Sequence, residues 1–232
     1  MATAGAELPY IPVLAAFDHE ENGSQSDTGA DGPLLGSVLE RSVFARGGSY
    51  EDRARAFAGT VCLSSDTGHA VHPNYAERHD PTHHPRVNGG PILKVNVNNR
   101  YATDGSGRAV FAAACEKAGV PFQSFVSNNS MPCGTTIGPI TAARHGIRTV
   151  DIGVAILSMH SARELCGDAD PYLLANAWWP SSRGSWSEAG ARPCLVRPRR
   201  GTRQCEDRGP EPPDRTGPDR EATPWASAGA SS

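Results

Sequence analysis

Apolar and polar positions along residues 1–177 follow the pattern of a domain in which strands and helices alternate. Short apolar or alternating runs predict strands at residues 10–17, 60–63, 91–97, 122–126 and 147–152. Apolar residues at helical spacing predict helices at residues 34–43, 110–118, 140–144, 161–166 and 171–177. This order predicts an α/β fold, with a layered mixed sheet flanked by helices.

Residues 178–232 have a different composition. They hold all four tryptophans, 8 of the 19 prolines and nine arginines, but no lysine, isoleucine or phenylalanine. Such a segment buries too little apolar surface to offset its chain entropy, so we predict a disordered tail beside one domain at residues 1–177. Two alternatives remain: an arginine-rich arm that binds an acidic partner, and GC-rich DNA translated out of frame. We favour the out-of-frame hypothesis.

Charge and composition exclude several classes of protein. The net charge is -3 at pH 7, which favours neither nucleic acid nor an anionic membrane as a partner. No apolar run approaches the roughly 18 residues that a membrane helix needs, and the N-terminus lacks the basic residues of a secretory signal. The six cysteines form no Cys-x-x-Cys pair, which indicates reduced thiols. We therefore predict a cytoplasmic protein with no nucleic acid or membrane partner.

Two adjacent glutamates, Glu20 and Glu21, follow the first predicted strand. Open α/β sheets place their ligand crevices beyond the carboxyl ends of strands. Adjacent residues there point in different directions, so one carboxylate can bind a metal while its neighbour faces the reacting water. This arrangement suits metal-assisted hydrolysis. Most such pairs belong to solvated loops with no catalytic role, so the pair by itself is weak evidence.

Other residues with metal-binding side chains follow other predicted strands. Asp66, His69 and His72 come after the strand at 60–63, and His160 comes after the strand and loop that begin at Ile147. Oxygen and imidazole donors without thiolate suit a catalytic zinc, manganese or cobalt ion better than a structural zinc. The alternatives are loop histidines in a histidine-rich stretch and, for His160, a capping or packing role.

The stretch "NSMPCGTTIGP" at residues 129–139 is a glycine- and threonine-containing loop that leads into a predicted helix. Exposed backbone N–H groups in such a loop can hold a carboxylate or a transition-state oxyanion. A tight turn is the alternative, because the spacing is not that of a phosphate-binding loop.

Five motifs in a fixed order, "FDHEENGS", "SSDTGHAVHPNY", "GPILKVN", "PCGTTIGP" and "SMHSARE", resemble the aspartyl aminopeptidase family of dinuclear zinc exopeptidases. The resemblance covers about residues 10–177. It implies a zinc-exopeptidase-like fold and an enzyme that removes N-terminal residues, with acidic ones preferred, from peptide substrates. It also implies two zinc ions as cofactors and homo-oligomers among full-length relatives.

The resemblance also implies roles for individual residues. Glu20 is similar to the general base that activates the metal-bridging water. Glu21 and His160 are similar to ligands of one zinc ion, and Asp66 is similar to a ligand of the other. We therefore expect Glu20 to act on water while Glu21 holds metal.

Two further residues, His69 and Lys94, match positions that the family uses near the substrate. Lys94 lies on the predicted polar face of its strand, and a cation there would suit an acidic side chain of the substrate.

The sequence also departs from the family pattern. Family members carry an upstream stretch with a further histidine ligand, an aspartate that bridges both metals and an inserted dimerisation domain, and these have no counterpart here. The sequence therefore resembles the C-terminal part of a catalytic domain, whose incomplete site we expect to bind zinc poorly and to hydrolyse little. The alternative is a non-catalytic fragment or oligomer partner from a truncated, frameshifted gene.

Overall fold

The computed structural model describes residues 10–180, with side chains up to residue 177. Its elements are α1 (Leu34–Ala45), α2 (Tyr50–Gly59), β1 (Val61–His69), β2 (Ile92–Lys94), α3 (Gly105–Ala118), β3 (Gln123–Phe125), α4 (Gly138–His145), β4 (Arg148–Leu157), β5 (Leu165–Cys166) and α5 (Asp170–Pro180), with 3-10 turns at Glu20–Asn22 and Ala76–Arg78. The predicted α/β class is confirmed. The predicted disordered tail lies outside the described residues, except that α5 runs on to Pro180.

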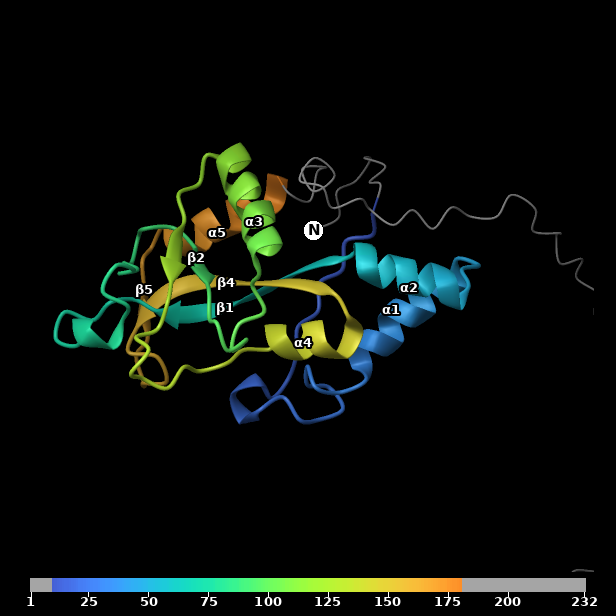
Figure 1. Ribbon diagram of the computed structural model, residues 1–232, viewed down its shortest axis with the longest axis horizontal. Helices are drawn as coiled ribbons and strands as arrows, with labels where there is room; N and C mark the ends of the chain where they lie inside the picture. The colour runs from blue at the N-terminus through green and yellow to red at the C-terminus, as the bar shows by residue number, and fades with distance from the viewer. Residues whose placement is uncertain (1–9, 181–232) are drawn as a thin grey trace, which may run out of the picture. The chain divides into compact units, whose positions relative to one another are not determined.

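A mixed sheet forms the centre of this part of the chain (Figure 1). The strand order is β1-β4-β2-β3, and β5 pairs with β4. β1 is parallel to β4, β2 is antiparallel to β4, and β3 is parallel to β2. Every residue of β4 from Thr149 to Ile156 is buried, as expected for a strand that is covered on both faces.

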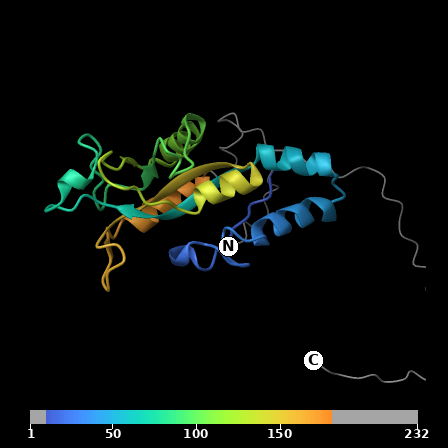
Figure 2. The same cartoon turned by 60° about the horizontal axis from the view of Figure 1, so that its bottom comes forward.

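Helices cover the two faces of the sheet. In Figure 1, α3 and α5 lie on one side of β4 and α4 lies on the other, and Figure 2 shows the same elements turned by 60°. The core between the sheet and the α3–α5 pair contains Leu93, Phe111, Val150 and Ile152, each at most 1% exposed. Alternate residues of the strands therefore face α4, and these include Asp151.

Capping residues explain where two of the helices begin or end. The Asp104 carboxylate accepts a hydrogen bond from the Gly107 N–H at the start of α3, and Gly119 ends this helix with a φ of 65°. Ser49 and Asp52 form a capping box at the start of α2, a helix that the apolar pattern does not predict. The pattern is weak there because Phe57 is the only buried residue of α2.

The predicted strand at residues 10–17 is wrong. This segment has no regular structure, and Ile11 and Leu14 are 58% and 80% exposed. An apolar run becomes a buried strand only when neighbouring strands satisfy its backbone groups, and no strand within residues 10–180 pairs with it. The two glutamates that follow therefore lie on a turn, and not at the tip of a strand.

Several other predicted elements change in length or type: β4 runs on to Leu157, and α3 begins at Gly105. The strand expected at residues 60–63 extends to His69, so Asp66 lies within β1 and not after it. The strand expected at 91–97 ends at Lys94, because the Asn96 side chain accepts hydrogen bonds from the Asn98 and Arg100 N–H groups and turns the chain. The helix expected at 161–166 is wrong: this stretch is a loop followed by β5.

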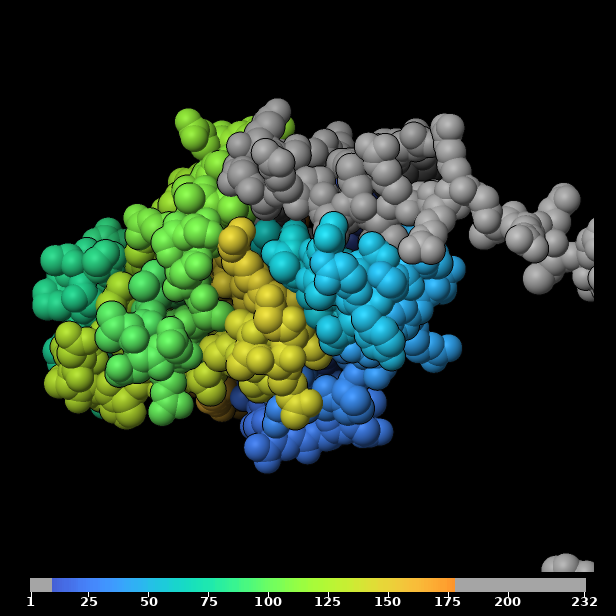
Figure 3. Space-filling model, turned by 45° about the vertical axis from the view of Figure 1, so that its right-hand side comes forward, coloured from blue at the N-terminus to red at the C-terminus, as the bar shows by residue number. Residues whose placement is uncertain are grey.

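The helices α1 and α2 dock against α4 through His145. In the space-filling view, the yellow surface of α4 adjoins the blue and cyan surfaces of α1 and α2 (Figure 3). The His145 ring packs edge-to-face on Phe57, with ring centroids 6.3 Å apart. A Cβ atom at Gly36 would lie 2.9 Å from Cε1 of His145, so a larger residue at this position would force the His145 ring to shift. The buried Nε2 atom of His145 has no hydrogen-bond partner within the described residues.

From the burial of His145 we predict that acid destabilises the packing of α1 and α2 against α4. Burial lowers the pKa of His145, the cations of Arg144 and Arg53 lower it further, and Glu40 opposes them. The unfolded chain therefore takes up this proton first, so stability is lost as the pH falls below about 6.5. We expect the urea midpoint of the wild type to fall more between pH 7.5 and pH 5.5 than that of His145→Gln. Equal falls in the two proteins would contradict this.

Candidate metal centre

The two glutamates lie on the short turn Glu20–Asn22. This turn is closed by a hydrogen bond from the Gly23 N–H to the Glu20 carbonyl at 3.0 Å. His19 and Gly23 flank it with φ values of 61° and 91°, and the His19 ring is fixed by Ser26, with Nδ1 and Oγ 2.8 Å apart. Because the residues on both sides have left-handed backbone conformations, the turn is tight. The two adjacent carboxylates therefore project from the same short turn.

Asp66 and Lys94 come from the sheet. Lys94 Nζ lies 3.1 Å from Oδ2 of Asp66, and Oδ1 of Asp66 accepts a hydrogen bond from the Thr67 N–H. Lys94 does lie on the opposite face of β2 from Leu93, as the alternation predicts. However, this face is covered, and the Lys94 side chain is only 2% exposed. Lys94 is therefore a buried cation that pairs with Asp66.

His160 comes from the loop after β4. It has a φ of 64°, and its N–H donates to Oε1 of Glu164 at 2.6 Å. The ring atom Nε2 lies 3.0 Å from Oε2 of Glu21, and both side chains are exposed. Two donor atoms on one tetrahedral zinc ion lie roughly 3.3 Å apart, given zinc–ligand distances of about 2.0–2.1 Å. The spacing of this carboxylate and imidazole thus fits a shared zinc ion.

Electrostatic interactions connect Glu20 with these residues. Partial burial raises the pKa of Glu20, and the carboxylates of Asp66 and Glu21 raise it further. Lys94 and His160 act in the opposite direction and lower it. A carboxyl group in such surroundings holds a proton more readily than an isolated glutamate, as a general base must.

His69 lies at the end of β1, with its ring centroid 6.4 Å from that of Phe125. The residue is exposed, but partial burial of the ring lowers its pKa, and His79, His160 and Lys94 lower it further. His69 is therefore uncharged over a wider pH range than a free histidine. The ring of His72 lies instead against Tyr75, with centroids 5.2 Å apart.

Two residues around the site were not singled out by the sequence. Lys94 Nζ lies 5.5 Å from the ring centroid of Tyr101, and His79 places Nε2 3.2 Å from the carbonyl oxygen of His69. Tyr101 and His79 are both buried. Tyr101 follows the end of β2, and His79 lies in the histidine-rich loop, so neither position carries a local signal of its role.

The glycine- and threonine-containing loop makes structural contacts. The Thr136 hydroxyl donates to Oδ1 of the buried Asp151 at 2.6 Å, and the Thr135 hydroxyl donates to the Arg100 carbonyl at 3.0 Å. The Asp151 carboxylate also accepts a hydrogen bond from the Ala102 N–H at 2.6 Å. These bonds fix the loop to β4 and to the segment that follows β2.

The donor types fit zinc, but their number is small. Glu21 and His160 form one pair of donors, while the Asp66 carboxylate is held by Lys94. Within residues 10–180, no three histidine, cysteine, aspartate or glutamate side chains lie close enough together to hold a metal ion. A zinc ion takes four ligands, so these residues provide only part of a coordination shell.

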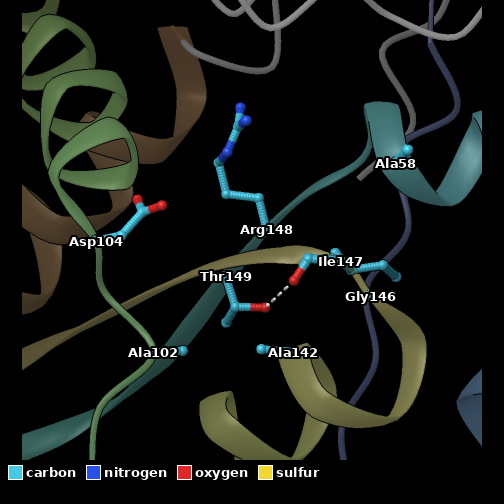
Figure 4. Close-up of a pocket in the computed structure, with 8 residues that line it drawn as sticks. All are labelled: Ala58, Ala102, Asp104, Ala142, Gly146, Ile147, Arg148 and Thr149. Atoms are coloured by element: carbon cyan, nitrogen blue, oxygen red, sulfur yellow. Dashed lines mark hydrogen bonds between the residues drawn. The ribbon is translucent and has the colours of Figure 1, made fainter. Parts of the chain in front are cut away.

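A pocket at the opposite end of the sheet contains none of these residues. It lies at the start of β4 and is lined by Ala58, Asp104, Arg148 and Thr149, among others (Figure 4). The Thr149 hydroxyl donates to the Ile147 carbonyl at its edge. His160, in contrast, follows the carboxyl end of β4, so this pocket is separate from the candidate metal centre.

Comparison with known sequences finds relatives that belong to one family. The sequence model of the aminopeptidase I zinc metalloprotease (M18) family matches residues 2–178. "Probable M18 family aminopeptidase 2" of Streptomyces coelicolor is 92% identical over 177 residues, which is 76% of this chain and 41% of that protein. The protein of the same name from Mycobacterium tuberculosis is 56% identical over 165 residues, which is 71% of this chain and 38% of that protein. The chain thus spans about two fifths of the length of these relatives.

Solved structures agree with this result. The crystal structure of prApe1 is 36% identical with a TM-score of 0.69, and the match covers 74% of this chain and 37% of that one. The crystal structure of yeast aminopeptidase 1 (Ape1) is 35% identical with a TM-score of 0.65, and the match covers 75% and 40%. The fold and the resemblance inferred from the five motifs are confirmed. The chain therefore belongs to the aminopeptidase I zinc metalloprotease (M18) family, which is a family of hydrolases.

Proposed function

We propose that the chain carries the general base and three metal ligands of a zinc aminopeptidase that removes N-terminal residues from peptides. The observation that supports this most directly is the approach of Glu21 to His160, with Oε2 and Nε2 3.0 Å apart although the two residues come from opposite ends of the described chain. Glu20 and Asp66 interact with the same group of charges. This grouping of acidic and imidazole side chains supports the proposal.

The metal-binding roles divide between the two groups of donors. Glu21 and His160 would hold one zinc ion, and Asp66 would hold the second. Zinc, when bound, lowers the pKa of water and polarises a carbonyl group. Glu20 takes the proton from the attacking water on its carboxylate and returns it to the nitrogen of the departing amine.

We assign His69 and Lys94 to substrate binding. His69 lies at the exposed end of β1, where a neutral imidazole can donate or accept a hydrogen bond. The Lys94 ammonium would pair with an acidic N-terminal side chain, which would explain a preference for aspartyl or glutamyl peptides. This pairing requires the ammonium to leave Asp66, to which it is bound in this structure.

Zinc binding tests the proposed ligands. We expect the purified chain to bind zinc weakly, because residues 10–180 provide only a partial ligand set. Glu21→Ala and His160→Ala should each weaken this binding by about 10-fold or more, measured by competition with a chromophoric chelator, because each removes one donor of the pair. Glu116→Ala, on the exposed surface of α3, is the control and should bind as the wild type does. Two tightly held zinc ions per wild-type chain would contradict the expected weak binding, and unchanged affinity in both variants would contradict the ligand assignment.

A second candidate function is a non-catalytic subunit that associates with complete relatives. The partial ligand set within residues 10–180 favours it. Hydrolysis of an aspartyl or glutamyl chromogenic peptide by the zinc-saturated chain would support catalysis. The absence of any hydrolysis at full zinc occupancy would support the non-catalytic role.

We propose that the protein is cytoplasmic and forms homo-oligomers. None of the helices within residues 10–180 combines the length and the apolar composition needed to cross a membrane. One solved relative is described as the S. cerevesiae mApe1 dodecamer, and it is 34% identical to this chain with a TM-score of 0.63. Sedimentation of the purified chain would test whether it self-associates.

A further inference from the structure

Lys94 is a charged side chain in the interior of the sheet. It is only 2% exposed and is among the largest side chains that are fully buried in the described residues. A buried ammonium group is costly unless an opposite charge compensates it. The compensating charge is the Asp66 carboxylate, with Nζ and Oδ2 3.1 Å apart. Asp66 thus uses one carboxylate oxygen on a cation that the protein itself supplies.

Two glycines of the sheet lie beside the Lys94 side chain. A Cβ atom at Gly68 of β1 would lie 3.4 Å from Cε of Lys94, and one at Gly153 of β4 would lie 3.3 Å from it. The lysine stem therefore extends from β2 across β4 toward β1. Beyond the stem, the ammonium lies 5.5 Å from the ring centroid of the buried Tyr101, within reach of a cation–π interaction. The sheet therefore accommodates the ammonium and offers it an aromatic face in addition to Asp66.

We infer that Lys94 occupies the Asp66 carboxylate as an internal counter-ion, so that a divalent cation binds at Asp66 only by displacing the ammonium. This inference rests on the proposed role of Asp66 as a metal ligand. A zinc ion bound to Asp66 would lie within a few ångströms of the ammonium in its present position, where the two cations repel each other strongly. In its present position the ammonium lies 5.5 Å from the ring centroid of Tyr101, so a small movement toward this ring keeps a favourable cation–π contact. The displaced ammonium also becomes available to an acidic substrate side chain.

Variants at Lys94 test, through zinc affinity alone, this exchange of the Lys94 ammonium for a zinc ion at Asp66. Lys94→Met has a similar unbranched stem but no charge, so we expect it to bind zinc at least about 10-fold more tightly than the wild type, because the competing cation is gone. Lys94→Arg keeps the charge and should show no such gain. Lys117→Met, on exposed α3, is the matched control and should bind as the wild type does. Zinc affinity in Lys94→Met that is equal to or weaker than that of the wild type would overturn the inference.

A second measurement covers the case in which Lys94→Met does not fold. In the wild-type chain labelled with 15N-lysine, zinc should shift the side-chain resonance of Lys94, and the shift should be absent from the zinc-treated Asp66→Asn variant. A Lys94 resonance that zinc leaves unchanged at saturation would overturn the exchange. The proposed ligand pair is tested separately: if zinc binding depends on Glu21 and His160 but not on the charge at Lys94, the proposed function stands and the exchange does not.

Discussion

Replacement of Glu20 by glutamine should abolish hydrolysis without emptying the metal centre. Glutamine keeps the size of the side chain but cannot accept the proton from water, and removal of a general base typically slows a reaction by about 10²–10⁴-fold. The measurement is product release from an aspartyl or glutamyl chromogenic peptide by the zinc-saturated chain, together with its zinc content. Glu20 lies beside the proposed ligands and is not one of them, so the zinc content should stay close to that of the wild type.

Two variants distinguish the base from a ligand. Glu21→Gln should lose zinc and activity together, because the amide is a poorer zinc ligand than the carboxylate. Glu116→Gln, on exposed α3, should change neither. Full activity of Glu20→Gln would contradict the role of Glu20, and loss of zinc in this variant would place Glu20 among the ligands.

Replacement of Asp151 by alanine should greatly reduce the stability of the folded protein. Asp151 is 0% exposed, and its carboxylate accepts hydrogen bonds from the Thr136 hydroxyl and the Ala102 N–H, both at 2.6 Å. Alanine would leave the buried Thr136 hydroxyl and the partly buried Ala102 N–H without an acceptor and open a cavity next to Gly138. We expect the free energy of unfolding to fall by about 3–5 kcal/mol, a large part of the stability of an ordinary domain.

Urea denaturation measures this effect. Asp168→Ala is the matched control, because Asp168 is exposed and should change stability by no more than about 0.5 kcal/mol. Asp151→Asn keeps one carbonyl acceptor and should fall between Asp151→Ala and the wild type. A loss of less than about 1 kcal/mol in Asp151→Ala would show that other groups take over these hydrogen bonds.

Local sequence was sufficient for elements that contain their own signals. The helix α3 has a buried apolar face and a C-terminal glycine, and it forms over the predicted residues 110–118, although it begins earlier, at Gly105, behind the N-cap Asp104. The apolar run at residues 147–152 likewise predicts a strand, and β4 forms there, from Arg148 to Leu157. The segment at residues 10–17 has an equally apolar run but forms no strand, because a strand also needs partners, which a local pattern cannot reveal.

In the candidate site, too, the sequence predicted some features, while others depend on contacts between distant segments. Motif order identified Glu20, Glu21, Asp66 and His160, and the structure brings them into one electrostatic group. The motifs did not reveal that Lys94 is buried against Asp66. That contact depends on the register of β1, β2 and β4, which is set by long-range pairing.

The sequence by itself determined the α/β class and the family, and it supplied the candidate residues for acid–base and metal chemistry, because these depend on residue types in a fixed order. Tertiary structure alone decided which charges meet: Glu21 with His160, and Lys94 with Asp66. The physical reason is that charges interact over a few ångströms in space, and residues at those distances here come from segments that are far apart along the chain.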